Sequence, residues 1–138
     1  MAWVDGGGRI DLFVSLHNTN NDYMQGPLTK AGPEYRAMIE HLADLLRTKT
    51  VYEPKAPRDL PPGEVARGRM SAIEGLFHDR GIRTLLIEQN TRTNSKLGKP
   101  LVGPDYMKFG EQLPVLLAEA VTASKTAPQP GSTARAPR

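Results

Sequence analysis

The chain has 138 residues, of which 38% are hydrophobic and 24% charged, values typical of one globular domain. Its net charge of +3 is too small to indicate a nucleic-acid-binding surface. Cysteine is absent, which excludes disulfides and cysteine-based zinc or redox sites. No apolar run approaches the ~20 residues of a membrane span. Residues 1–8 lack the basic and apolar regions of a signal peptide, and localisation stays open.

The first predicted element is a strand over residues 9–16. Its largely apolar run from Ile10 to Leu16 is typical of a strand buried in a parallel sheet. His17 follows at once, and residues 17–31 are rich in Asn, Asp, Gly and Pro, which predicts a loop. Open α/β sheets bind ligands at the carboxyl ends of their strands, so His17 is a candidate functional residue.

Residues 33–47 are predicted to form an amphipathic helix, with proline and an acid in the first turn. Residues 48–53 contain a candidate short strand. Four prolines in residues 54–63 predict a surface loop, because proline is excluded from helix interiors and central strands. The apolar face of the helix repeats at three- and four-residue spacing and consists of Tyr35, Met38, Ile39, Leu42, Leu45 and Leu46.

A second helix is expected over residues 64–79, with a glycine at position 81 to end it in the left-handed conformation. The apolar run that follows predicts a strand over residues 82–88, so helix and strand complete a β-α-β unit. The buried side of this helix is expected to consist of Val65, Met70, Ile73, Leu76 and Phe77.

The polar segment from Glu88 to Gly103 predicts another loop, and a third helix begins near Pro104. Pro114 is expected to kink this helix. Residues 124–138 contain no aliphatic side chain larger than alanine and are expected to be disordered. The elements together predict an α/β fold, with a mostly parallel sheet and flanking helices over residues 1–123.

Glu88 is the second candidate functional residue. A carboxylate directly after a buried strand loses hydration and needs a cation, a metal or a proton as its partner. Such a group is suited to act as a general base on water. An ion pair with Arg83 or Arg92 is the purely structural alternative.

His17 has a similar pair of interpretations. Neutral imidazole is the commonest metal ligand, and it needs a hydrogen-bond partner, which Asn18, Asn20 or a loop carbonyl could provide. A lone histidine is also often a structural residue. His41 lies on the predicted polar side of the first helix, and His78 lies near the end of the second helix, where the dipole favours a cation.

Residues 12–18 (LFVSLHN) resemble the strand of zinc carboxypeptidases that ends in their third zinc ligand, a histidine. Residues 81–88 (GIRTLLIE) are similar to the later strand of that family, which ends in the catalytic glutamate. The separation of the two segments is close to that in the family, and Asn90-Thr91, Tyr106 and Gly110 look like its bacterial branch. The resemblance covers residues 9–121.

The resemblance implies the C-terminal part of a phosphorylase/hydrolase-like zinc peptidase fold. It also implies His17 as a zinc ligand and Glu88 as the general base that takes a proton from zinc-bound water. Arg92 is the arginine expected to bind the substrate's terminal carboxylate, with Arg67 and Arg69 as alternatives, and Asn18 and Asn90 are expected to contact substrate. The catalytic tyrosine of the pancreatic type has no counterpart between residues 62 and 80.

The sequence departs from the family at its first two zinc ligands, which come from a His-x-x-Glu segment well before the third. No such segment precedes His17, so we expect either a fragment or a degenerate relative without a full zinc site, and whether the chain is active by itself stays open.

Two other interpretations stay open. Zinc N-acetylmuramoyl-L-alanine amidases have a similar Asp-Leu-Phe-Val-Ser-x-His strand and a later catalytic glutamate, although residues 89–92 do not match the loop that follows it. A non-catalytic α/β domain is the third. The expected partner is a peptide or peptidoglycan-like substrate, with no nucleic acid. If His17 and Glu88 share a site, their side-chain ends should lie within about 6–7 Å, one zinc shell plus a water.

Overall fold

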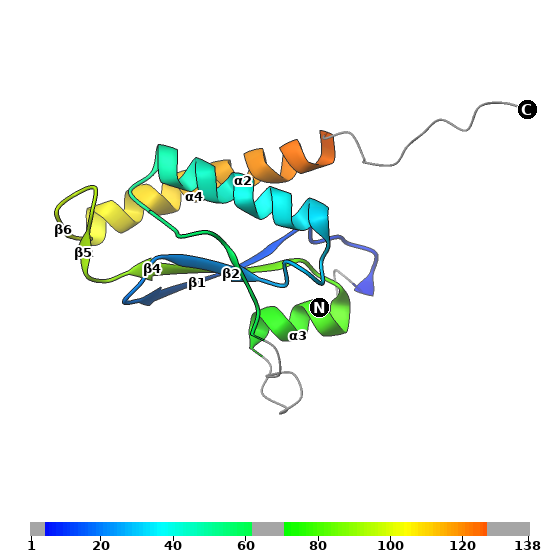
Figure 1. The fold of residues 1–138 in the computed structure, drawn as a ribbon. Helices are drawn as coiled ribbons and strands as arrows, with labels where there is room; N and C mark the ends of the chain where they lie inside the picture. The colour runs from blue at the N-terminus through cyan, green and yellow to red at the C-terminus, as the bar shows by residue number, and fades with distance from the viewer. Residues whose placement is uncertain (1–4, 62–70, 127–138) are drawn as a thin grey trace, which may run out of the picture.

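The computed structural model describes residues 5–61 and 71–126 (Figure 1). No helix within these two ranges is long and apolar enough to cross a membrane. The elements in chain order are β1 (Phe13–Thr19), β2 (Tyr23–Gly26), α2 (Pro33–Lys49), β3 (Arg58–Asp59), α3 (Ala72–Arg80), β4 (Thr84–Asn90), β5 (Thr93–Asn94), β6 (Lys99–Pro100) and α4 (Gly103–Thr126).

The main sheet has four strands in the order β1-β4-β2-β3. β1 runs parallel to β4 and β2 runs parallel to β3, whereas β2 and β4 are antiparallel. β5 and β6 form a separate antiparallel pair. The prediction of an α/β fold with a mostly parallel sheet and flanking helices is therefore confirmed.

The helices form layers on both faces of the sheet (Figure 1). α2 and α4 lie side by side on one face, and α3 lies on the other. The apolar face predicted for α2 is buried as expected, and His41 is exposed on the polar side. Burial of this face against the sheet and α4 supplies most of the core, because each fully buried large apolar side chain contributes about 1.5–3 kcal/mol. The most deeply buried members of the core are Met24, Leu28, Tyr35, Ile39, Leu42, Leu46, Tyr52, Leu85 and Ile87.

The start and end of α3 are both capped. The Ser71 side chain accepts a hydrogen bond from the Glu74 N–H, and the Glu74 carboxylate accepts one in return from the Ser71 N–H. This reciprocal capping box satisfies donors that a helix N-terminus leaves free. Gly81 ends the helix in the left-handed conformation, with φ of 64°, as the sequence predicts.

Gly26 allows α2 to approach the sheet closely. A Cβ at this position would lie 2.6 Å from the Tyr35 hydroxyl oxygen and 2.8 Å from the Thr84 carbonyl oxygen. Tyr35 is fully buried, and its hydroxyl donates a hydrogen bond to that carbonyl. The contact joins α2 to β2 and β4 at one point.

The strands differ from the prediction in position. β1 and β4 start and end later than predicted, so His17 lies within β1 and not directly after it, and Glu88 lies inside β4 and not at its last residue. The parallel pairing continues from Phe13 opposite Thr84 to Thr19 opposite Asn90. The polar residues at the ends of both strands still form the backbone hydrogen bonds of the parallel sheet. Their side chains are typical of turns, and the sequence therefore predicted a loop at these positions.

Three loop predictions need correction. Residues 17–31 contain β2, which pairs with β4 although turn-forming residues surround it. The loop predicted after Glu88 holds the end of β4 and the β5–β6 pair, and the proline-rich loop over residues 54–63 holds β3.

The short strand predicted over residues 48–53 is not found. Its first residues belong to the last turn of α2, and Thr50 caps that helix with its N–H bonded to the Leu46 carbonyl. Thr50 also donates its hydroxyl proton to the same carbonyl at 2.7 Å, which holds the segment against the helix end.

The predicted helix over residues 64–79 is also corrected. Ser71 has extended backbone (φ −66°, ψ 163°), so one continuous helix does not run through it. Ile73 is buried as expected, Leu76 and Phe77 are partly buried, and Val65 and Met70 lie outside the described residues.

α4 begins at Gly103 and continues through Pro114 to Thr126. Residues 124–126, expected in the disordered tail, are therefore helical, and residues 127–138 lie outside the described part of the chain. Lys125 forms an ion pair with Asp11 at 3.2 Å, which holds the end of α4 against the segment before β1.

Candidate functional site

Three side chains lie in one row across the sheet. His17 of β1 is directly opposite Glu88 of β4, and Glu88 is directly opposite Tyr23 of β2. Because side chains at paired positions share one face, all three lie on the face that carries α3. His17 Nδ1 lies 3.6 Å from Glu88 Oε1, well within the separation expected of a shared site.

Glu88 is the buried centre of this row. Its side chain is 6% exposed, and Oε1 accepts a hydrogen bond from the Tyr23 hydroxyl at 3.4 Å. Oε2 is buried and has no hydrogen-bond partner in the described part of the chain. Neither Arg83 nor Arg92 forms an ion pair with Glu88 in the described part of the chain, and Arg83 pairs with Glu34 at 3.8 Å. The structural alternative for Glu88 is therefore not observed.

His17 is the exposed end of the row, with a side chain 58% exposed. Its Nε2 lies 3.1 Å from the Ser15 hydroxyl, which precedes it by two residues and shares its face of β1. Ser15 thus orients the ring in place of the expected Asn18, Asn20 or loop carbonyl.

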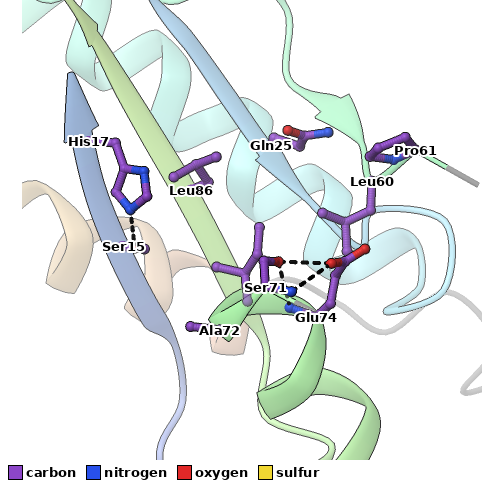
Figure 2. A pocket seen from close by; sticks show the side chains of 10 residues that line it. Ser15, His17, Gln25, Leu60, Pro61, Ser71, Ala72, Glu74 and Leu86 are labelled. Atoms are coloured by element: carbon purple, nitrogen blue, oxygen red, sulfur yellow. Dashed lines mark hydrogen bonds between the residues drawn. The ribbon is translucent and has the colours of Figure 1, made fainter. Parts of the chain in front are cut away.

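A cleft adjoins His17 on the same face of the sheet. Figure 2 shows its wall, which comes from β1, β2, β4, the segment after β3 and the first turn of α3. Its volume is about 250 Å³. The lining side chains are Ser15, His17, Gln25, Leu60, Pro61, Ser71, Ala72, Ile73, Glu74 and Leu86.

Negative groups lie behind the row, near Tyr52. Burial raises the pKa of the Tyr52 hydroxyl, and the carboxylates of Asp22 and Glu88 raise it further. This hydroxyl donates to the Tyr23 carbonyl at 2.7 Å. Burial also raises the pKa of Asp22, although its Oδ1 accepts a hydrogen bond from the Asn90 N–H at 2.8 Å. Asp22 and Glu88 therefore both place negative charge near the Tyr52 hydroxyl.

The other predicted site residues do not join the row of His17, Glu88 and Tyr23. Asn18 follows His17 in β1, so strand alternation places its side chain on the opposite face. Asn90 lies on the face of Glu88, but its Oδ1 accepts a hydrogen bond from the Arg92 N–H at 2.8 Å and so stabilises the turn after β4. Arg92 is exposed in that turn. Arg67 and Arg69 lie outside the described residues.

The described residues do not complete a zinc site. A catalytic zinc takes three protein ligands, and His17 with Glu88 provides two candidate groups. No cluster of three or more His, Asp or Glu side chains able to hold a metal occurs within residues 5–61 and 71–126.

Sequence reasoning missed three residues of this region. Tyr23 was hidden by the turn-forming residues on either side of its short strand, and no local pattern marks Ser15 as the partner of His17. The contribution of Glu74 had a signal: Ser71 and Glu74 form the S-x-x-E pattern of a capping box, which marks a helix start.

Comparisons with protein-family models, with curated proteins and with solved structures found no match to this chain.

Proposed function

We propose that this chain carries the general-base part of a carboxypeptidase-like centre that hydrolyses an amide bond of a peptide. In this proposal Glu88 is the general base and His17 is a metal ligand. The adjacent parallel strands β1 and β4 support it, because they place the two side chains opposite each other as the resemblance to zinc carboxypeptidases implies. The proposed fold is the C-terminal part of a phosphorylase/hydrolase-like zinc peptidase.

The observation that carries the proposal is the free oxygen of Glu88. The Tyr23 hydroxyl donates to Oε1 and His17 Nδ1 lies 3.6 Å from it, while Oε2 is buried and has no donor among the described residues. A buried acceptor without a donor is costly unless a ligand or water satisfies it. In the proposed reaction, Oε2 takes a proton from a water whose oxygen bonds to the amide carbon. Glu88 then returns that proton to the nitrogen as the carbon–nitrogen bond breaks.

Metal binding is a separate measurement, because the described residues do not complete the ligand set. We expect the purified chain to bind zinc weakly in equilibrium dialysis, and His17→Ala to reduce that binding. Equal zinc binding by the variant would remove His17 as a ligand.

Hydrolysis is tested with the full chain and added zinc on N-acylated dipeptides and on muramoyl peptides, with products identified by mass spectrometry. We expect the dipeptides to be cleaved and Glu88→Gln to lower kcat by about 10²–10⁴-fold, the usual contribution of a general base. Glu119→Gln, which removes an exposed carboxylate on α4, is the matched control and should leave kcat unchanged.

Each alternative outcome has a distinct meaning. Cleavage of muramoyl peptides alone would favour the amidase interpretation over the carboxypeptidase one. Cleavage that survives Glu88→Gln would refute Glu88 as the base. Absence of cleavage by a folded chain that has bound zinc would favour the non-catalytic α/β domain.

A further inference from the structure

Glu74 is a second buried carboxylate, and one of its two oxygens has no hydrogen-bond donor among the described residues. The proposed reaction does not use Glu74. The residue is 2% exposed and lies in the first turn of α3. Oε2 accepts hydrogen bonds from the Ser71 N–H at 3.0 Å and from the Ser71 hydroxyl at 2.9 Å. Oε1 is buried and has no hydrogen-bond partner within residues 5–61 and 71–126. The capping box therefore explains one oxygen and not the other.

Among the described residues, no side chain of opposite charge matches the carboxylate of Glu74. No Lys, Arg or His in the described part of the chain lies within ion-pair distance of its carboxylate. The N-terminus of α3 stabilises the Glu74 carboxylate through the two hydrogen bonds that Ser71 donates to Oε2, and these leave Oε1 without a donor. A buried carboxylate oxygen without a donor costs free energy, and a charged donor is its strongest partner.

Glu74 lies in the wall of the cleft next to His17. Figure 2 shows its carboxyl group between Ser71 and Leu60, with one oxygen turned toward Ser71 and the other turned away from it. The walls around it are apolar at Leu60, Pro61, Ile73 and Leu86. The cleft of about 250 Å³ has room for several water molecules or for a short alkyl chain.

We propose that this cleft binds an alkylammonium or alkylguanidinium group, with the cation hydrogen-bonded to Glu74 Oε1 and the alkyl chain against the apolar wall. A cation satisfies the free oxygen and neutralises the buried charge, which a neutral donor does only in part. A lysine-like or arginine-like side chain is the natural form of such a ligand. Binding in the cleft requires neither a metal nor hydrolysis, so the inference stands or fails separately from the role proposed for Glu88.

The test uses n-butylamine and n-butylguanidine as probes and n-butanol as their neutral counterpart. The full ¹⁵N-labelled chain is titrated with each probe, and amide chemical shifts are followed by NMR. We expect saturable shifts at Ser71, Glu74 and Leu86 with the two cations. Butanol should bind at least about tenfold more weakly, because its hydroxyl can donate a hydrogen bond but carries no charge to pair with the carboxylate.

Glu74→Gln is the sharpest variant, because glutamine also serves as the third residue of a capping box. We expect it to remain folded and to bind both cations at least about tenfold more weakly. Glu119→Gln removes the same charge from an exposed site and should bind as the unaltered chain does. Equal binding of butylamine and butanol by the unaltered chain, or no binding of either cation, overturns the proposal. Undiminished cation binding by a folded Glu74→Gln overturns it as well.

Discussion

Gly26→Ala is expected to destabilise the fold strongly, although it adds only one methyl group. The new Cβ would lie 2.6 Å from the Tyr35 hydroxyl oxygen and 2.8 Å from the Thr84 carbonyl oxygen, both closer than real Cβ contacts allow. Tyr35 is fully buried and cannot swing into solvent. Overpacking of this kind costs about 1–3 kcal/mol, and loss of the Tyr35 hydrogen bond adds about 0.5–1.5 kcal/mol.

The expected decrease in the free energy of unfolding is therefore about 1.5–4.5 kcal/mol, a large part of the ~5–15 kcal/mol typical of a domain. Urea unfolding followed by circular dichroism measures it. The matched control is Gly110→Ala on the exposed side of α4, where a Cβ meets nothing within 4 Å. This control should stabilise the protein by about 0.5–1 kcal/mol, since alanine favours helix more than glycine does.

A double-mutant cycle separates the two contacts. Tyr35→Phe removes the nearer oxygen, so the Gly26→Ala/Tyr35→Phe double variant should lose about 1 kcal/mol less than the sum of the single variants. Strict additivity would show that the hydroxyl does not cause the strain. A Gly26→Ala variant as stable as the unaltered chain would refute the close approach of α2 to the sheet.

Three further predictions concern stability. Burial raises the pKa of Asp22 in the folded chain, and the Glu53 carboxylate adds to this. Stability is therefore lost as the pH rises from the unfolded pKa of Asp22 to its folded pKa, and the loss is complete above the folded pKa. Asp22→Asn keeps an acceptor for the Asn90 N–H and should be the more stable form at neutral pH in urea unfolding. This advantage should shrink as the pH falls toward the unfolded aspartate pKa of about 3.9 and vanish below it, and a constant difference would contradict this reasoning. Leu42→Ala should cost about 2–5 kcal/mol in the same assay because Leu42 is fully buried in the core. His41→Ala, next to it on the exposed side of α2, should change stability by less than about 0.5 kcal/mol, and similar losses for both would mean that the buried face is assigned incorrectly.

Local patterns in the sequence determined a large part of the fold. The spacing of apolar residues from Tyr35 to Leu46 predicted α2 and its buried face. This was possible because the 3.6-residue period of a helix can be recognised within one continuous segment of sequence. Gly81 marked the end of α3, since its left-handed conformation is a local property of the chain. The apolar runs before His17 and Glu88 marked two strands and singled out both residues.

Tertiary structure alone decided how these pieces meet. The sequence did not reveal that β2 enters the sheet beside β4, because a four-residue strand among turn-forming residues has too short a pattern to detect. That insertion places Tyr23 opposite Glu88 and leaves one oxygen of Glu88 buried without a donor. The cleft beside Glu74 likewise combines five segments that are distant along the chain. Strand order and register arise from packing across the whole sheet, so a local pattern can name His17 and Glu88 but cannot bring them within 3.6 Å of each other.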